Sequence, residues 1–362
     1  MEIEILYQKL IKPFLPTPSH LQHYKLSFFD QIAEQEHVPI VLFYANNNLI
    51  NNFTIDERIE QSLSKVLTHV YPAAGSSHPA MDGFSNIKFL FEWAKVCKMT
   101  TPVENIDFLR FNLSDVFPTR DISGLFKSTY DPVTEKDIVT KRFVIRGTSI
   151  SRLRKSCIRG GLTFQPSRVE IITALLWRAF IRASATISGY VRPSLMDLPL
   201  NLRSKTSLPQ VQNSMGNFRL DVPIKFVPGE TKVELLDFVI LIRNAVNKVV
   251  ASCTKASPDE IASTLVDVYN ESFTSPEWGG NDEVDEVSCS SLCNFPFHDI
   301  DFGLEKPKLL FFGIKDMQMF WLYDTDVHSE VGVQVDLKEK YMKLFECDDD
   351  IKALTLIHNA NL

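Results

Sequence analysis

His78-Pro79-Ala80-Met81-Asp82 is the stretch that decides how this chain is interpreted, and Gly83 and a run of apolar residues follow it directly. The stretch has the pattern HxxxD, and none of the other seven histidines has an aspartate four residues later. A neutral imidazole can take a proton from a hydroxyl or an amine that acts as a nucleophile. His78 is therefore the candidate catalytic residue.

The residues after the HxxxD stretch predict an amphipathic helix, because Phe84, Ile87, Phe91 and Ala94 recur at helical spacing. We expect this helix to begin at or just after His78, so that the positive end of its dipole keeps the imidazole neutral. Asp82 then lies about one turn inside the helix. That position favours a structural ion pair for Asp82 over a second catalytic carboxylate.

The size and composition of the chain limit its class. A length of 362 residues accommodates two domains, and 44% hydrophobic with 23% charged residues is typical of a globular protein. The net charge of −7 argues against a general affinity for nucleic acid or for an anionic membrane. We see no secretory signal and no unbroken apolar run of the roughly 18 residues that span a bilayer.

The six cysteines are scattered, and only Cys289 and Cys293 lie close together in the sequence. No second cysteine or histidine pair completes a zinc pattern, so we predict no metal site. Free thiols, buried or half-buried, are the expected state, which is typical of a cytoplasmic protein.

Helices and strands alternate along the whole chain, which predicts a layered α/β architecture. Helix starts are predicted from capping boxes, in which a hydroxyl and a glutamate three residues later satisfy two free amides, at Thr54/Glu57, Ser167/Glu170, Thr231/Glu234 and Ser257/Glu260. Strands are predicted at 142–145, 196–202, 308–314, 319–323 and 331–335, with a hairpin connection at 313–316. A loop is predicted at 118–132, and we interpret it as a linker between two domains. A second loop is predicted at 275–291, where four acidic residues form a solvated surface.

Five segments in order along the chain resemble the BAHD family of plant acyl-CoA-dependent acyltransferases. These are Tyr71-Pro72-Ala73-Ala74-Gly75, the HxxxD stretch with its helix, the helix from Ser167 to Arg178, the stretch from Asn201 to Asn217, and Phe295-Pro296-Phe297 with Asp301-Phe302-Gly303. Further details near the N-terminus resemble a subgroup of acetyltransferases. Together the five matches are far more specific than any one of them.

The resemblance implies a two-domain chloramphenicol-acetyltransferase-like fold, that of CoA-dependent acyltransferases. The N-terminal domain would span residues 1–117 and the C-terminal domain residues 133–362, joined by the linker 118–132. Acyl-CoA would be a co-substrate, with no other cofactor, and a small-molecule alcohol of plant specialised metabolism would be the acceptor. His78 would act as the general base of an O-acyltransferase that forms no acyl-enzyme. A monomer is the expected state of the protein.

The resemblance also implies roles for further residues. Asp82 would hold a basic side chain, with Arg203 as the candidate, and Asp301 and Gly303 would shape the loop that carries them. Ser204, Lys205, Gly216 and Asn217 would contribute to CoA binding.

The chain departs from the family pattern at two places. Only Ser76 and Ser77 separate the segment that ends at Gly75 from His78, where family members have several tens of residues, so we expect a shortened N-terminal domain with exposed strand edges. In the DFGWG loop, Leu304 replaces tryptophan and Glu305 replaces the second glycine. Two alternatives stay open: a non-catalytic relative that binds a ligand or a partner, and a peptide-condensation-type domain, which shares HxxxDG but lacks the Asp301 loop.

Overall fold

The computed structural model describes residues 8–19, 23–33, 39–45, 52–71, 81–99, 101–125, 137–272, 278, 283–313, 317–327 and 329–357, with the backbone alone at 52–54, 272 and 355–357. The HxxxD histidine, the segment 72–77 and residues 126–132 of the predicted linker lie outside this part of the chain.

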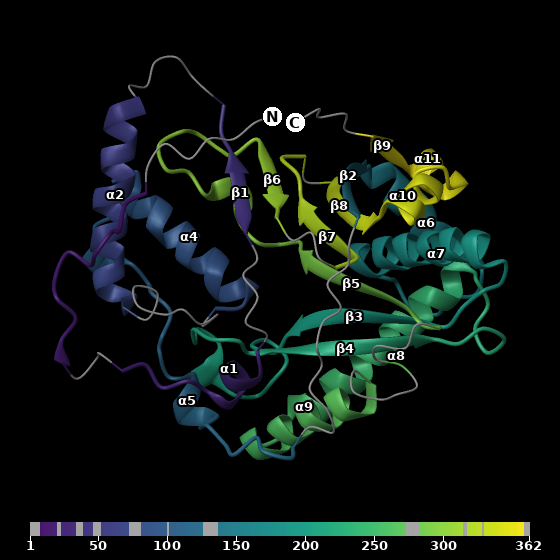
Figure 1. The fold of residues 1–362 in the computed structure, drawn as a ribbon, viewed down its shortest axis with the longest axis horizontal. Helices are drawn as coiled ribbons and strands as arrows, with labels where there is room; N and C mark the ends of the chain where they lie inside the picture. The colour runs from purple at the N-terminus through teal and green to yellow at the C-terminus, as the bar shows by residue number, and fades with distance from the viewer. Residues whose placement is uncertain are drawn as a thin grey trace.

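A mixed seven-stranded sheet forms the centre of the larger part of the molecule (Figure 1), with strands in the order β4-β3-β5-β7-β8-β2-β9. The pairs β3–β5 and β5–β7 are parallel, and the other four neighbours are antiparallel. The strands are β2 (Ile138–Ile145), β3 (Ser194–Asn201), β4 (Arg219–Phe226), β5 (Asp285–Leu292), β7 (Met319–Asp324), β8 (Val331–Lys338) and β9 (Thr355–Ile357).

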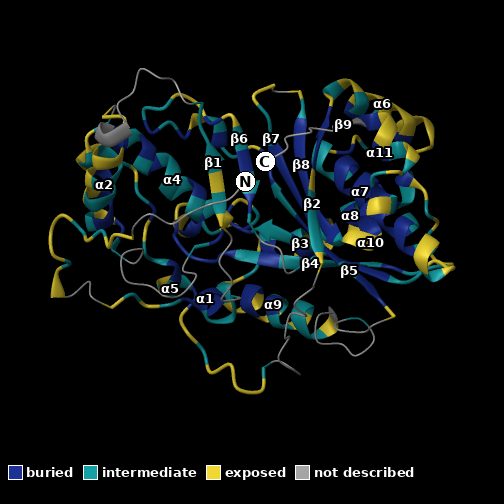
Figure 2. Cartoon of the chain, turned by 45° about the horizontal axis from the view of Figure 1, so that its top comes forward, coloured by how far each residue is buried: buried dark blue, intermediate teal, exposed yellow. Residues whose placement is uncertain are grey.

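Helices pack against this sheet, and α7 (Arg168–Ser188) is the most deeply buried of them (Figure 2). The others are α6 (Gly147–Arg159), α8 (Leu235–Thr254), α9 (Pro258–Ser272), α10 (Glu339–Phe345) and α11 (Asp349–Leu354). By length and composition α7 could cross a membrane, although Arg178 and Arg182 interrupt its apolar residues, and 72% of the apolar window is buried inside the protein. A core helix passes the same test.

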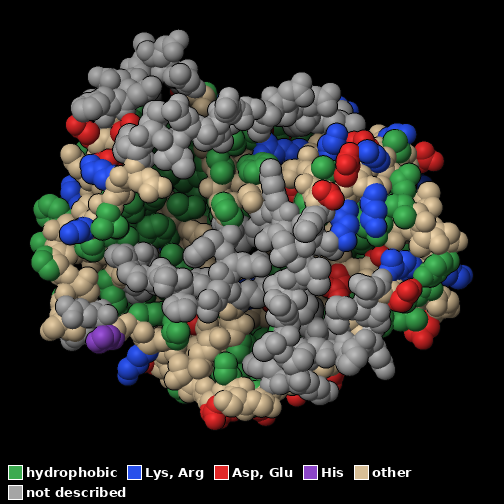
Figure 3. Space-filling model, viewed as in Figure 1, with side chains coloured by type: hydrophobic (Ala, Val, Ile, Leu, Met, Phe, Trp, Pro, Cys, Tyr) green, Lys and Arg blue, Asp and Glu red, His purple; other side chains and the backbone are tan. Residues whose placement is uncertain are grey.

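The N-terminal part lies beside the sheet and carries a second, two-stranded sheet, in which β1 (Ile40–Phe43) pairs antiparallel with β6 (Leu309–Phe312). Its helices are α1 (Phe28–Ile32), α2 (Asn52–His69), α4 (Gly83–Cys97) and α5 (Leu113–Val116). Short 3₁₀ turns follow at η2 (Val103–Asn105), η3 (Pro209–Val211) and η4 (Phe297–Asp299). Among the described strands β1 has no neighbour on its other edge, and apolar side chains gather in a recess where Figure 1 places α4 (Figure 3).

The apolar core does not follow the domain boundaries that the sequence predicts. Phe28, Phe29 and Phe117 from the N-terminal region pack into the same main cluster as Trp177 of α7. In return, strand β6 and the residues around Phe297 and Phe302 pack with α4 in a second cluster. The two regions therefore share each other's cores.

Several predicted elements are present. The capping box Ser167/Glu170 opens α7, and Ser257 and Glu260 bond each other's backbone amides before α9. The predicted strands correspond to β2, β3, β6, β7 and β8, and the predicted helix after HxxxD corresponds to α4.

Other predictions were wrong. Helix α2 begins at Asn52, before the predicted cap Thr54. Helix α8 begins after Glu234, and the side chain of Glu234 forms no cap. The predicted capping box is not formed there because the backbone at Thr231 pairs with Pro228 instead. The predicted hairpin at 313–316 does not pair its two strands, since β6 joins β1 while β7 lies between β5 and β8. The acidic loop ends earlier than expected: strand β5 begins at Asp285, which is buried.

Candidate acyltransfer site

Of the HxxxD motif that the sequence singles out, the structure describes Met81 and Asp82, whereas His78 lies outside the described residues. Asp82 is the N-cap of α4 and not a residue inside the helix, which corrects the predicted helix start. One carboxylate oxygen accepts a hydrogen bond of 2.9 Å from the backbone N–H of Ser85. The side chain thereby satisfies one of the amides that the first turn of a helix leaves free.

The other carboxylate oxygen of Asp82 accepts a hydrogen bond of 2.6 Å from Nη1 of Arg203, and each side chain is only 3% exposed. This is the ion pair that the sequence analysis expected. The two residues stand 121 positions apart. Burying both charges so far from water costs free energy. Removing only one partner costs more, because the other charge is then buried without a counter-charge.

Arg203 also organises the backbone around it. Its Nη2 donates to the carbonyls of Ser214 and Gly216, at 3.0 and 2.9 Å, and to Oγ of Ser85 at 3.2 Å. The guanidinium lies 4.5 Å from the centroid of the Phe84 ring, a cation–π geometry. The start of α4 is thus fixed against residues 214–216 by one buried arginine.

Gly216 is required at its position for two reasons. Its φ of +132° is one that residues with a side chain rarely adopt, and a Cβ there would lie 2.6 Å from Cδ2 of Leu113 and 3.2 Å from Oδ1 of Asp30. The carboxylate of Asp30 in turn accepts from the backbone N–H of Asn217 at 2.8 Å and from its side-chain amide at 3.0 Å. Helix α1 therefore adds a second set of contacts to residues 216–217, beside those of Arg203.

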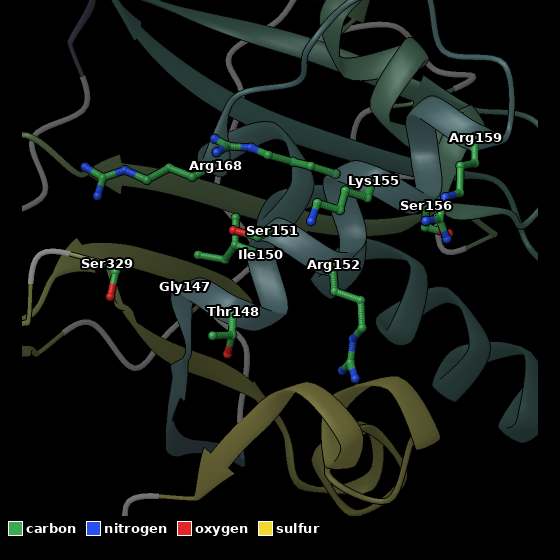
Figure 4. Close-up of a pocket in the computed structure, with 11 residues that line it drawn as sticks. Gly147, Thr148, Ile150, Ser151, Arg152, Lys155, Ser156, Arg159, Arg168 and Ser329 are labelled. Atoms are coloured by element: carbon green, nitrogen blue, oxygen red, sulfur yellow. The ribbon is translucent and has the colours of Figure 1, made fainter.

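The four residues expected to bind CoA divide into two kinds. Gly216 and Asn217 are buried and are engaged with Asp30, whereas Ser204 is exposed and Lys205 is half-exposed. None of these four residues lines the cavity of about 900 Å³ on α6 (Figure 4).

Asp301 closes the second predicted motif, on the loop after η4. One of its oxygens accepts from the backbone N–H of Gly303 at 2.7 Å, and the other forms a 2.5 Å ion pair with Lys98, just after α4. Partial burial alone would raise the pKa of Asp301, but the Lys98 ammonium and the Gly303 amide outweigh it and hold this pKa below its ordinary value.

Gly303 lies against Arg58 of α2, a residue that the sequence analysis did not identify. The φ of Gly303 is +89°, and a Cβ on it would come within 2.3 Å of Nη2 of Arg58, which itself donates to the Phe302 carbonyl at 3.0 Å. Arg58 and Phe302 are 244 positions apart in the sequence, so only the folded structure shows that Arg58 contacts this loop.

The substituted position Glu305 keeps a backbone conformation suited to glycine. Its φ is +70°, in the left-handed region where a side chain costs energy. The side chain of Glu305 is therefore accommodated with backbone strain at this residue.

The cysteines are free, and all but Cys347 are buried. Burial raises the pKa of the Cys289 thiol to about 12 and that of Cys293 to about 11, so both are poor nucleophiles. In the described part of the chain, no three His, Cys, Asp or Glu side chains are grouped closely enough to hold a metal ion.

Comparison with known proteins gives the fold. The solved structure of vinorine synthase superposes with a TM-score of 0.76 at 22% identity, covering 96% of this chain and 97% of that chain. F. graminearum TRI101 in complex with coenzyme A and T-2 mycotoxin gives a TM-score of 0.55 at 15% identity, over 77% of this chain and 65% of that chain. The fold is the two-domain chloramphenicol-acetyltransferase-like fold of CoA-dependent acyltransferases.

Curated plant enzymes are similar over nearly the full length. Akuammiline synthase 1 of Alstonia scholaris is 26% identical over 439 positions, covering 99% of each chain, and minovincinine 19-hydroxy-O-acetyltransferase of Catharanthus roseus is 25% identical, covering 96% of each. These alignments are longer than the 362 residues of the chain, so the relatives have residues that it lacks.

A sequence model of the Transferase family matches residues 1–77 and 76–351, two stretches that meet just before His78. This junction is the place where the sequence analysis located the missing segment. Together the two stretches cover most of the chain. The chain belongs to the Transferase family, the plant BAHD acyltransferases.

Proposed function

We propose that the protein transfers an acetyl or other short acyl group from acyl-CoA to a hydroxyl group of a plant specialised metabolite, with His78 as the general base. The observation that carries this proposal is the buried Asp82–Arg203 pair, which anchors the N-terminus of α4 directly after the HxxxD stretch. Minovincinine 19-hydroxy-O-acetyltransferase and acetyl-CoA-benzylalcohol acetyltransferase of Clarkia breweri, two similar proteins, are named for acetyl transfer.

The reaction balances without a covalent enzyme intermediate. His78 takes the proton of the acceptor hydroxyl, and the oxygen attacks the thioester carbonyl. The tetrahedral oxyanion collapses, the carbon–sulfur bond breaks, and the CoA thiolate takes the proton from His78. A general base of this kind contributes roughly 10²–10⁴-fold to the rate.

Acyl transfer from acetyl-CoA to a panel of alcohols tests the proposal. The expected result is turnover that falls by about 10²–10⁴-fold in His78→Ala, because the base is removed. His23→Ala is the matched control, since His23 is exposed and lies on no described catalytic element, and it should turn over like the wild type. Equal loss in both variants would contradict the proposed role of His78.

A non-catalytic CoA-binding relative is the second candidate, because the chain lacks the residues that the family carries just before the histidine. A base displaced by about 1 Å can lose on the order of 10²-fold in rate. Binding of CoA by the wild-type chain, with no turnover of any alcohol, is the result that would favour this candidate.

The remaining expectations complete the proposal. We propose a cytoplasmic monomer that needs no metal or prosthetic group, since base and donor together account for the step. Unchanged turnover in EDTA, a monomeric mass by light scattering and recovery in the soluble cytosolic fraction are the expected results.

A further inference from the structure

One buried arginine of the central sheet lacks a partner. Arg142, on β2, is 8% exposed, and its two terminal guanidinium nitrogens have no hydrogen-bond partner in the described part of the chain. Arginine stays protonated in proteins, so this buried group is a charge. A buried charge without a counter-charge is far less favourable than a paired one. Arg142 is thus the opposite case to Arg203, which is also buried but is bonded to a carboxylate.

Two polar side chains near Arg142 are already engaged with other groups. Gln334 stands opposite Arg142 in the β2–β8 pair, but its amide exchanges hydrogen bonds of 3.0 and 2.7 Å with the backbone of Phe312. The carboxylate of Asp336, which is fully buried, accepts from the indole N–H of Trp321 at 3.1 Å and from the Gln334 amide at 3.0 Å. Neither group therefore serves as an acceptor for the guanidinium.

Burial decides the electrostatics of Arg142. Removal from water lowers the pKa of its guanidinium, and the nearby Tyr323 and Asp336 oppose this effect only in part. An anion bound at the terminal nitrogens would supply the missing counter-charge. A carboxylate fits the forked guanidinium best, because the two groups can form two parallel hydrogen bonds.

Aromatic side chains surround the guanidinium. It lies 4.9 Å from the centroid of the Phe311 ring. The ring of Tyr323 lies over Gly332, where a Cβ would come within 2.4 Å of the ring. Apolar surroundings of this kind penalise a strongly hydrated phosphate dianion more than a singly charged, planar group. They therefore also favour a carboxylate.

The site is close to the surface on the side of β1 and β6. Phe311 is half-buried on β6, and Val41, its partner on β1, is 41% exposed. Residues directly opposite each other in an antiparallel pair share one face of the sheet. Figure 1 shows β6 between β1 and β7. A rotation of the Phe311 ring would therefore open Arg142 to a ligand.

The face of the sheet that carries Arg142 extends to the HxxxD helix. Arg142 is aligned with Gln334 and Trp321 in the sheet register. Trp321 packs in the same apolar cluster as Leu292 of β5. Leu292 lies 3.5 Å from the Cβ position of Gly83, the first residue of α4. Three strand spacings of about 4.8 Å separate β5 from β2, so Arg142 lies about 14 Å across the sheet from this contact.

We propose that Arg142 binds a carboxylate group of the acyl acceptor, so that the acceptor is a hydroxy acid whose two functional groups lie far apart. The inference rests on the proposed function for the reaction itself. A span of about 14 Å exceeds the length of a short acyl group, so the acceptor and not the donor carries the carboxylate. Arg142 is a binding residue and takes no part in bond making.

Calorimetric titration with 12-hydroxydodecanoate and with its methyl ester tests the proposal without requiring turnover. The wild type should bind the acid about tenfold more tightly, because the ester cannot form the charge-assisted bonds to Arg142. Arg142→Met should abolish this preference. Arg142→Lys, which keeps the charge without the fork, should reduce it to about threefold and provides the test if the methionine variant does not fold.

Lys141→Met is the matched control. Lys141 is the preceding residue on β2, is exposed, and forms a surface ion pair with Glu346. Successive side chains of a strand point to opposite faces, so this variant removes a cation from the other side of the sheet. It should keep the tenfold preference of the wild type for the acid. Loss of the preference in both variants would overturn the proposal.

Thermal unfolding separates ligand binding from a structural role. Arg142→Met removes an unpaired buried charge, so the ligand-free variant should unfold at the same temperature as the wild type or at a higher one. The acid should raise the Tm of the wild type and leave that of Arg142→Met unchanged. A lower Tm of ligand-free Arg142→Met, with its preference for the acid intact, would assign Arg142 a purely structural role.

Acyl transfer identifies the substrate that carries the carboxylate. The wild type should have a higher kcat/KM for 12-hydroxydodecanoate than for its ester, whereas the shorter 6-hydroxyhexanoate should gain nothing over its ester, because its hydroxyl does not reach the motif from Arg142. The ratio of the KM values for malonyl-CoA and acetyl-CoA should be the same in the wild type and in Arg142→Met. A changed ratio would assign the carboxylate to the donor and overturn the proposal.

The two proposals fail separately. A wild-type chain that prefers the hydroxy acid through Arg142 but acylates no alcohol refutes the catalytic proposal and leaves the carboxylate site intact. A chain that acylates alcohols, yet binds the acid and the ester equally, refutes the carboxylate site alone.

Discussion

Asp82 and Asp301 are both carboxylates of sequence motifs, and each joins α4 or its end to a distant segment, yet their surroundings differ sharply. Asp82 and its partner Arg203 are each 3% exposed, whereas Asp301 is 15% exposed and its partner Lys98 is 47% exposed. The Arg203 side chain makes further bonds to four other residues, while Lys98 is bonded to Asp301 at an exposed helix end.

The comparison teaches that the contribution of an ion pair between motif residues to stability depends on how far water reaches the pair. Water screens the Lys98–Asp301 pair and can solvate either partner alone. No water compensates Arg203 if Asp82 loses its charge, so the buried site depends on both partners. The following variants test this difference.

Asp82→Asn should have the largest effect, a loss of roughly 3–5 kcal/mol in the free energy of unfolding, because it leaves the Arg203 charge buried without a counter-charge. Urea unfolding measures it. In a double-mutant cycle, Arg203→Met combined with Asp82→Asn should be less destabilised than the sum of the single variants. Simple additivity would show that the two residues do not act as a pair.

Gly303→Ala should cost about 1–3 kcal/mol, because it places a side chain at φ +89° and against Arg58. Gly229→Ala is a matched control, since Gly229 has a φ of +90° with nothing within 4 Å of its Cβ position. The excess loss in Gly303→Ala over Gly229→Ala in thermal unfolding measures the Arg58 contact. Equal losses of stability in the two variants would show that backbone strain alone, and not the Arg58 contact, causes the effect.

Glu305→Gly should stabilise the loop of Asp301 by about 0.5–1 kcal/mol, because glycine adopts the φ of +70° at this residue without steric cost. The gain appears as a higher Tm. A lower Tm would mean that the Glu305 side chain makes a stabilising contact that exceeds the strain.

Asp301→Asn should have the smallest effect at neutral pH, about 0.5 kcal/mol, as is usual for a solvent-accessible pair. Because the pKa of Asp301 is lowered in the folded protein, its contribution is present above the ordinary carboxyl pKa of about 3.9. It is lost as the pH falls through the lowered value. The difference between wild type and Asp301→Asn in urea unfolding should therefore shrink between pH 6 and pH 3, and a constant difference would contradict it.

The sequence predicted elements whose signals are local. The Ser167/Glu170 capping box lies within three residues and is present as expected. Thr231/Glu234 has the same spacing, but there the backbone of Thr231 pairs with Pro228 in a turn, which replaces the capping box. Local patterns therefore fail where a competing local structure uses the same residues.

Long-range pairing could not be read from local patterns. The hairpin expected after β6 fails because β6 finds its partner in β1, over 250 residues earlier in the chain. Arg203 was identified as the partner of Asp82 only through family resemblance, and Arg58 was missed because nothing in its sequence neighbourhood indicates Gly303.

The pairing of β1 with β6 has a consequence for dissecting the protein. Residues 40–43 and 309–312 complete each other's hydrogen bonding, and Phe28, Phe29 and Phe117 lie in the main core. A fragment ending at residue 117 would lack both its strand partner and much of its apolar cover. Two fragments produced from separate genes, 1–117 and 133–362, should each be poorly soluble alone and should reassemble when expressed together.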